Sequence, residues 1–425
     1  MGGSQILYKQ YIKGLLYLSA QIAYIVYMLM FGFSSLCGLV TLGTQEQTTV
    51  YDPELGFNVT VAGDNSMLML IYGVMTAAIT VLFVLLYRAN IRGARTAGRE
   101  YKTSGKAKSF IQDVISLGDS RFHVAMMSLP LIGILLFTVL PLIFMVLIAF
   151  TNYDKSHQPP GNLFDWVGLD NFKNMLWGND LLSGTFFPVL IWTIVWAVLA
   201  TFTCYIFGIL AALLINKKDV RFKGFWRTIL VLTIAVPQFI SLLIMRNMLN
   251  RFGPINSALE SMGLISSPLP FLTDATWARA TVLIVNLWVG IPYTMLMTSG
   301  ILMNIPTDLY EAAKIDGAGP FKMFMTITLP HIWHVTAPLV ITQFIGNINN
   351  FNVIYLLTGG EPLTSSYYVA GKTDLLVTWL YKLTADEKDY NLASTIGILV
   401  FILSVIISLA AYRNTSSYKD EDRFA

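Results

Sequence analysis

Eight segments without a single Asp, Glu, Lys or Arg constrain this 425-residue chain more than any other feature. Each has the length of a transmembrane helix, which needs roughly 17–25 predominantly apolar residues. A spanning segment must satisfy its backbone hydrogen bonds internally, so each is predicted to be helical. The segments cover residues 15–42, 67–87, 124–150, 185–215, 228–245, 280–303, 335–357 and 394–412.

The composition agrees with a membrane protein. Charged residues make up 12% of the chain, about half the fraction that is usual in a soluble domain, and apolar residues make up 55%. Cys37 and Cys204 both lie within apolar segments, which indicates small hydrophobic residues and neither a disulfide nor a metal site. The first segment is too long for a cleaved signal sequence and is expected to remain as a span. We predict an all-α, multi-pass integral protein of the bacterial cytoplasmic membrane.

The distribution of positive charge predicts the orientation of the spans. If the N-terminus lies in the cytoplasm, 20 of the 28 Lys and Arg residues fall on the cytoplasmic side. The connection 88–123 alone holds eight of them, and the opposite connection 43–66 holds none. Lys and Arg accumulate in cytoplasmic loops of membrane proteins, so both termini are predicted to be cytoplasmic.

The basic connection also suggests a division of the chain. Residues 1–120 are predicted to form a two-span hairpin with a basic cytoplasmic linker, and residues 121–425 a six-span core. We interpret the positive charge of the linker as a topology signal that also contacts anionic membrane lipid. A nucleic-acid partner is not expected, because the basic run is short and no folded module surrounds it.

The cytoplasmic segment 304–333 differs from an ordinary connection. Helix-forming residues extend from Leu309 to Lys314, and Gly317 can end a helix with a positive φ. Pro320 suits the first turn of a second helix, which is expected to end before Leu329-Pro330. The pattern predicts two short helices that form a rigid elbow.

The same segment contains Glu-Ala-Ala, three residues, Gly, nine residues, Ile, one residue and Leu-Pro. This order resembles the EAA motif of binding-protein-dependent ABC import permeases. The resemblance implies that the elbow docks into a groove on a separate ATPase subunit. The implied coupling residues are Glu311, Ala312, Ala313, Asp316, Gly317, Ile327, Leu329 and Pro330. The alternative without a partner is an amphipathic hairpin that lies on the bilayer.

Further stretches resemble carbohydrate permeases, and most closely the MalF-like subunit of maltose and maltodextrin importers. These stretches are Trp166–Phe172, Asn286–Tyr293, Asn347–Phe351, Leu356–Gly360 and Thr373–Val377. The implied fold is a six-helix ABC importer permease core with an additional N-terminal two-helix hairpin. The implied substrate is an oligosaccharide, with maltose or maltodextrin preferred and a galacto-oligosaccharide as the alternative.

The resemblance also implies partners. They are a second, MalG-like permease subunit, two copies of an ABC ATPase subunit and an extracytoplasmic sugar-binding protein. The outer loop 151–184 lacks the large insert of enterobacterial members, which implies a binding protein anchored as a lipoprotein. The chain has no Walker A sequence, since Gly105-Lys106 lacks the required glycine spacing. It is therefore not expected to be an enzyme, and ATP would be bound by the partner, with no cofactor or metal on this chain.

A sugar path requires hydrogen-bonding groups and no fixed charge. Polar residues within spans usually face the helix bundle or a cavity. Gln343, Asn347 and Asn350 follow i, i+4, i+7 spacing on one helical face, and Pro237-Gln238 breaks the fifth segment. The resemblance implies sugar contacts at Gly290, Tyr293, Asn347 and Asn350, and we add Gln238 and Gln343 as candidate substrate-binding residues. These amides could instead join helices to one another.

The sequence disfavours two other classes of membrane protein. An ion-coupled secondary transporter normally carries a carboxylate near the centre of the membrane. None of the eight segments contains Asp or Glu, which disfavours this class. An intramembrane enzyme is also disfavoured, because the chain has no His-Glu-x-x-His sequence and no catalytic constellation within its spans.

Overall fold

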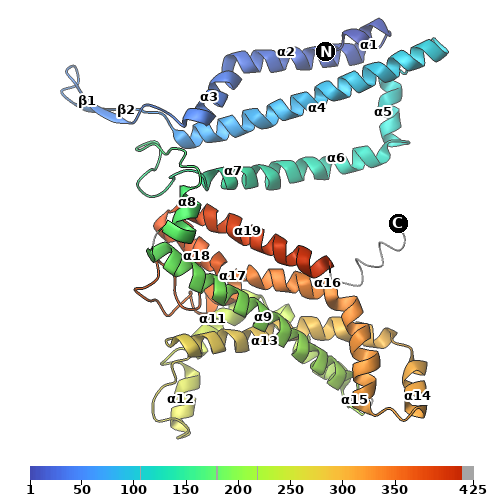
Figure 1. Cartoon of the computed structure of the whole chain (residues 1–425), viewed down its shortest axis with the longest axis vertical. Coiled ribbons are helices and arrows are strands. Elements are labelled where there is room, and N and C mark those ends of the chain that lie inside the picture. Colours follow the sequence, from blue (N-terminus) through green and yellow to red (C-terminus); the bar gives the residue numbers. More distant parts are fainter. Residues whose placement is uncertain (106, 179, 218, 414–425) are drawn as a thin grey trace. The chain divides into compact units, whose positions relative to one another are not determined.

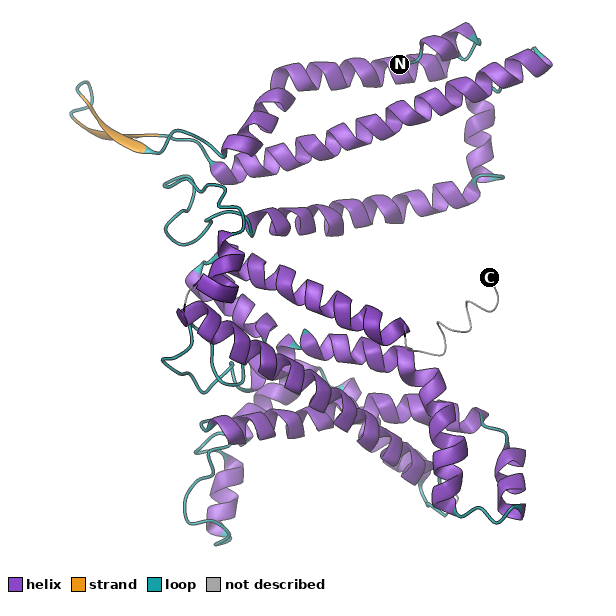
Figure 2. Ribbon diagram, in the orientation of Figure 1, coloured by secondary structure: helices purple, strands orange, loops and turns teal. Residues whose placement is uncertain are grey.

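The computed structural model describes residues 1–105, 107–178, 180–217 and 219–413. They form two compact units, one of residues 1–171 with 389–391 and the other of residues 172–388 with those from 392 onward. Both units are built of helices, and within the described residues the only paired strands form one hairpin in the first unit (Figure 2).

The first unit contains two long helical rods and one continuous long helix (Figure 1). The first rod spans 11–41 and the second spans 122–148, and a π-helical turn interrupts each of them. Leu42, Leu70, Ile148 and Phe164 form the buried apolar core of this unit. Its elements are α1 (Gly3–Leu7), α2 (Tyr11–Tyr27), η1 (Met28–Gly32), α3 (Phe33–Thr41), β1 (Thr48–Asp52), β2 (Phe57–Val61), α4 (Ser66–Ser104), α5 (Phe110–Gly118), α6 (Phe122–Ile134), η2 (Leu135–Val139) and α7 (Leu140–Ile148).

Helix α4 extends well beyond its apolar part and includes most of the basic residues of the connection 88–123. The Ala, Arg and Glu residues of this extension favour a helix and outweigh its two glycines. The helix ends where Gly105 adopts φ +69°, and the Gly105 N–H donates to the Tyr101 carbonyl at 2.9 Å. The basic linker is therefore largely helical.

The connection 43–66 contains a β-hairpin that the sequence analysis did not predict. Strands β1 and β2 pair antiparallel, with Thr48 opposite Val61 and Asp52 opposite Phe57. At the base of the hairpin the Asp64 carboxylate accepts hydrogen bonds from the backbone N–H groups of Thr44 (2.8 Å) and Gln45 (3.1 Å). These two hydrogen bonds lower the pKa of Asp64 below its ordinary value.

The second unit is organised around α9, which packs against α13 and α16 (Figure 1). Glycine permits the close crossing of α9 and α13, because a Cβ at Gly208 would lie 2.5 Å from the Cβ of Thr294. The elements are α8 (Asp170–Lys173), η3 (Asn174–Gly178), α9 (Asp180–Asn216), α10 (Lys223–Ala235), α11 (Gln238–Met248), α12 (Pro254–Ser261), α13 (Ala275–Asn304), α14 (Thr307–Ile315), α15 (Pro320–Met323), η4 (Phe324–Thr328), α16 (Leu329–Ile348), α17 (Phe351–Leu357), α18 (Leu376–Lys382), η5 (Leu383–Glu387) and α19 (Tyr390–Arg413).

All eight predicted segments are helical. Among the described residues, seven helices are long and apolar enough to cross a membrane. The remaining segment, 228–245, is the bent pair α10 and α11, whose axes differ by 93°. Pro237 lies at the bend, where it has no N–H to continue the helix and disfavours helical geometry at Val236. The described residues therefore contain seven candidate membrane spans, or eight if the bent pair forms one span.

Candidate functional site

The six predicted substrate-binding residues all line one cavity of about 380 Å³ in the second unit. Helices α9, α11, α13 and α16 and the start of α17 supply its walls. Its lining residues include amides, hydroxyls and glycines, and none of them is charged. They are Thr201, Cys204, Gln238, Asn286, Val289, Gly290, Tyr293, Thr342, Gln343, Gly346, Asn347 and Asn350.

A chain of hydrogen bonds fixes the two asparagines at the end of α16. The Asn350 side-chain N–H donates to Asn347 Oδ1 at 3.2 Å, and Asn347 Nδ2 donates to Thr201 Oγ1 at 2.9 Å. Asn350 Oδ1 also accepts from the Val353 N–H at 3.2 Å and so caps α17. Both asparagines thus border the cavity and also join helices, and their sugar contacts stay a prediction.

The other four predicted residues occupy different positions in the cavity wall. Tyr293 is half exposed, so its ring presents a flat surface. Gln238 Oε1 accepts a hydrogen bond from Asn352 at 3.2 Å, which ties α11 to α17. Gln343 is partly exposed in the wall contributed by α16. A Cβ at Gly290 would lie 2.4 Å from Cys204 Sγ, so this glycine permits close packing of α9 and α13.

Several lining residues were not predicted as sugar contacts. Thr201 and Thr342 add hydroxyl groups, and Thr201 gave no sequence signal because threonine is common in spans. Gly346 has open space around it, since an added Cβ would meet no atom within 4 Å. The structure contains no group of three or more His, Cys, Asp and Glu side chains able to hold a metal ion among its described residues.

Two buried tryptophans on α9 donate hydrogen bonds to segments that pack against this helix. Trp196 is fully buried, and its indole N–H donates to the Asn347 carbonyl at 3.1 Å. Trp192 is 6% exposed and donates to the Thr373 carbonyl at 3.2 Å. Neither residue is among the predicted sugar contacts, and their burial identifies them as packing residues.

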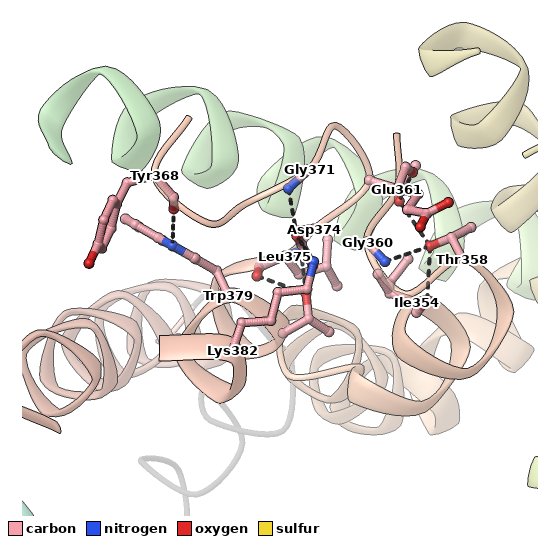
Figure 3. A network of polar contacts seen from close by, with 12 residues as sticks. Ile354, Thr358, Gly360, Glu361, Tyr368, Gly371, Asp374, Leu375, Trp379 and Lys382 are labelled. Carbon is pink, nitrogen blue, oxygen red and sulfur yellow. Dashed lines mark hydrogen bonds and ion pairs between the residues drawn. The ribbon is translucent and has the colours of Figure 1, made fainter. Parts of the chain in front are cut away.

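Beyond α17, a buried polar network joins two stretches that carried the sequence resemblance (Figure 3). The Thr358 and Thr373 hydroxyl groups lie 2.9 Å apart, and the Thr373 N–H donates to the Gly360 carbonyl at 3.2 Å. A Cβ at Gly360 would lie 2.1 Å from Asp374 Oδ1. Glycine is therefore required where the two stretches meet.

Asp374 is at the centre of this network and is completely buried. Its carboxylate accepts from Lys382 Nζ at 2.6 Å, from the Gly371 N–H at 2.7 Å and from Thr378 Oγ1 at 2.8 Å. Burial raises the pKa of Asp374 above its ordinary value, and the Lys382 ammonium opposes that rise. The network reaches α9 through the Leu376 N–H, which donates to Thr193 at 3.0 Å.

The elbow begins with α14 and turns at Gly317, as predicted. Gly317 adopts φ +75°, and its N–H donates to the Lys314 carbonyl at 3.0 Å. The Ala318 N–H donates to the Ala313 carbonyl at 2.9 Å, which completes a Schellman termination. Tyr310 Oη lies 2.9 Å from Thr328 Oγ1, so α14 is also fixed to the following helix.

The second half of the elbow differs from the prediction. We expected this helix to end before Leu329-Pro330, but α15, η4, α16 and α17 follow one another in a single spanning helical stretch, 320–357. The π-helical turn η4 precedes Pro330, and Pro330 falls in the first turn of α16. A local π-helical turn accommodates the hydrogen bond that proline cannot donate. The elbow is thus directly continuous with the helix that lines the cavity.

The implied coupling residues lie on both halves of the elbow. Glu311, Ala312, Asp316 and Gly317 are exposed, and Ala313 is half-buried. On the second half, Ile327 and Leu329 are half-buried and Pro330 is exposed. Ile315 and Phe321 are 87% and 72% exposed, so the elbow carries apolar side chains that the chain itself does not cover.

Comparison with known proteins confirms the resemblance found in the sequence. Residues 204–417 match the family "Binding-protein-dependent transport system inner membrane component". The galactooligosaccharides transport system permease protein GanP of Bacillus subtilis is 39% identical, over 99% of this chain and 96% of that protein. The maltodextrin transport system permease protein MalC of Streptococcus pneumoniae is 34% identical, over 99% and 95% respectively.

A solved structure shows the same fold. The crystal structure of a bacterial ABC transporter involved in the import of the acidic polysaccharide alginate aligns with a TM-score of 0.58 at 25% identity. The alignment covers 70% of this chain and 96% of that chain. The chain therefore belongs to the family of inner-membrane components of binding-protein-dependent transport systems, as a multi-pass, non-catalytic permease.

Proposed function

We propose that this chain is the permease subunit of an ATP-driven importer of neutral oligosaccharides. The observation that carries the proposal is the cavity of about 380 Å³, which is lined by amides and hydroxyls without a charged residue. Neutral amides and hydroxyls satisfy sugar hydroxyl groups, whereas an acidic sugar would require a cation to balance its buried charge.

The substrate class is a maltodextrin or a galacto-oligosaccharide, because the relatives that match nearly the whole chain have these two specificities. In this proposal Tyr293, Asn347 and Asn350 contact the sugar, with further hydrogen bonds from Gln238 and Gln343. Gly290 contributes by allowing α9 and α13 to approach closely at the cavity wall.

The energy for transport comes from partner subunits. The proposed complex contains a second permease subunit, two ABC ATPase subunits and an extracytoplasmic sugar-binding lipoprotein. The exposed coupling residues around Glu311 and Gly317, with Ile315 and Phe321, form the surface that the ATPase covers. A solved alginate transporter in complex with its substrate-bound periplasmic protein supports an assembly of this kind.

Both termini are proposed to lie in the cytoplasm, which places the elbow on the same side as the ATPase. The two-span hairpin and linker, 1–120, would then precede a six-span transport core, 121–425. Labelling of single cysteines by an impermeant thiol reagent tests this topology. A cysteine at Thr44 should react in intact cells, and one at Ser109 should react only after permeabilisation.

Competition by sugars tests the proposed substrate class. Uptake of a labelled maltodextrin or galacto-oligosaccharide by the complete transporter should be inhibited by unlabelled neutral oligosaccharides. Acidic oligosaccharides of the same length should not compete, because no cation lines the cavity among the described residues. Efficient transport of an acidic oligosaccharide would contradict the proposal.

A further inference from the structure

A second and larger cavity, of about 640 Å³, lies in the first unit between α1 and α4. It shares no residue with the oligosaccharide cavity, and the proposed transport function does not use it. Its lining combines cationic, aromatic and small residues. These are Met1, Gly2, Gly3, Ser4, Tyr8, Tyr87, Asn90, Ile91, Ala94, Arg95, Gly98, Arg99 and Lys102.

Specific contacts hold the cavity open. The completely buried Gln5 donates from Nε2 to the backbone carbonyl and to Oδ1 of Asn90, at 3.0 and 2.8 Å. Gly98 allows Tyr8 to lie against α4, because an added Cβ would be 3.1 Å from the tyrosine hydroxyl. Tyr8 also packs against the Tyr101 ring, with 5.7 Å between centroids. The cavity is thus a formed feature of the fold and not a gap between unpaired helices.

Three cations face this cavity from a single face of α4. Arg95, Arg99 and Lys102 follow i, i+4, i+7 spacing, and all three are exposed. Within the described part of the chain, none of them has an ion-pair or hydrogen-bond partner for its side chain, and no acidic residue lines the cavity. A site with this charge balance favours an anion with several oxygen acceptors, such as a phosphate ester.

The position of the cavity along α4 indicates the source of the phosphate. The uncharged part of this helix ends at Tyr87, and the cavity is lined by Tyr87 and by residues of the basic extension as far as Lys102, so it begins where the predicted span ends. The cavity lining also includes the apolar and aromatic side chains of Met1, Tyr87 and Ile91. A ligand that bound here would meet apolar surface next to the cationic group.

We propose that this cavity binds the headgroup of an anionic phospholipid, with its phosphodiester held by Arg95, Arg99 and Lys102. Basic pockets at the ends of membrane helices are suited to such headgroups. A purely diffuse attraction of basic residues to the membrane surface would require no cavity and would not distinguish one pair of arginines on α4 from another.

Matched pairs of substitutions test the proposal. The purified full-length chain is placed in phosphatidylcholine nanodiscs, and binding of fluorescent phosphatidylglycerol is titrated. The R95Q/R99Q variant should bind about 30-fold more weakly, because it removes two charged contacts to the phosphodiester, each of which contributes about 1 kcal/mol. The control variant R88Q/R92Q removes the same charge from the same helix outside the cavity and should keep wild-type affinity.

Other results would overturn the proposal. Equal losses in both variants would show diffuse attraction, and no loss in either would show that the cavity does not bind the lipid. Displacement of phosphatidylglycerol by inorganic phosphate at comparable affinity would assign the site to a soluble phosphate compound. If R95Q/R99Q fails to fold, Lys102→Gln replaces it, with an expected weakening of about fivefold. Sugar uptake is a separate measurement, so failure here leaves the transport proposal unaffected.

Discussion

At the scale of single residues, Asn350 combines an observed structural role with a proposed sugar contact. Its Oδ1 caps α17, and its Nδ2 donates to Asn347 within the cavity wall. A sugar contact and a helix cap make different demands on the residue. A cap needs only a side-chain oxygen, whereas a sugar contact also needs the amide N–H groups.

Two substitutions at Asn350 separate these roles. Asn350→Leu should lower both stability, by about 1 kcal/mol, and affinity for the oligosaccharide, because cap and amide are lost together. Asn350→Ser retains a capping oxygen and should lower affinity alone. Thermal unfolding in detergent and the concentration dependence of sugar uptake measure the two effects. Wild-type affinity in both variants would assign Asn350 to helix packing only.

Gly290 is predicted to act through packing. Gly290→Ala places a Cβ 2.4 Å from Cys204 Sγ and should destabilise the chain by about 1–3 kcal/mol. The Cys204→Ala substitution removes that sulfur, so the double variant should recover part of the lost stability. Thermal unfolding of the two single variants and the double variant provides the test. Full stability of Gly290→Ala alone would contradict the close packing of α9 and α13.

These residues also show what the sequence could predict at this scale. Helical spacing and the family resemblance placed Gln343, Asn347 and Asn350 on one face, and the structure brings them into one cavity. The contact between Gly290 and Cys204 could not be predicted, because it joins helices 86 positions apart in the chain. The role of Thr201 as a partner of Asn347 was missed for the same reason.

At the scale of elements, the Glu-Ala-Ala segment forms an elbow in which a hydrogen-bonded turn connects α14 to the following helix. Gly317 ends α14 with a positive φ, and its N–H is hydrogen-bonded. Proline fixes φ near −65° and has no N–H, so Gly317→Pro is incompatible with this turn. Asparagine tolerates a positive φ far better than other residues with a side chain.

The corresponding prediction compares Gly317→Pro with Gly317→Asn. The proline variant should remain in the membrane but lose ATP-driven uptake, because α14 no longer keeps its position. The asparagine variant should retain most uptake. Membrane fractionation and uptake in whole cells measure both properties. Wild-type uptake in Gly317→Pro would show that the elbow does not couple the subunits.

The buried polar network around Asp374 is predicted to stabilise the segment that leads into α18. Asp374→Asn should destabilise the chain by about 3–5 kcal/mol, because it leaves the Lys382 ammonium buried without its counter-ion. The double variant Asp374→Asn/Lys382→Met removes both charges and should be more stable than the single variant. Thermal unfolding compares them, and equal stability of Asp374→Asn and wild type would contradict this account.

Individual elements were predicted with different success. The break between α10 and α11 was predicted from Pro237, which has no N–H to continue the helix. A proline alone does not decide such a break, because Pro188, Pro292 and Pro338 lie inside continuous helices. The continuous helix from the elbow into α16 was missed, since a π-helical turn before Pro330 depends on neighbouring packing. The hairpin of β1 and β2 was also missed, because a single short strand pair in a loop gives a weak sequence signal.

At the scale of the whole molecule, hydrophobicity predicted where the long apolar helices lie. Each uncharged segment forms helix, because a single segment can satisfy its own backbone hydrogen bonds inside a membrane only as a helix. The charged residues all lie outside the eight apolar segments. Their distribution supports the proposed topology and the proposed phospholipid site. Neither the substrate nor the partners follow from these rules, and they rest on the cavity, the elbow and the relatives.

The most direct test of the account is oligosaccharide uptake by the purified complex in sealed proteoliposomes. Uptake should require the binding protein outside and ATP inside, and it should continue when an ionophore abolishes ion gradients. The Gly317→Pro complex should show none. Uptake by this chain without an ATPase subunit, driven by an ion gradient, would contradict the central claim.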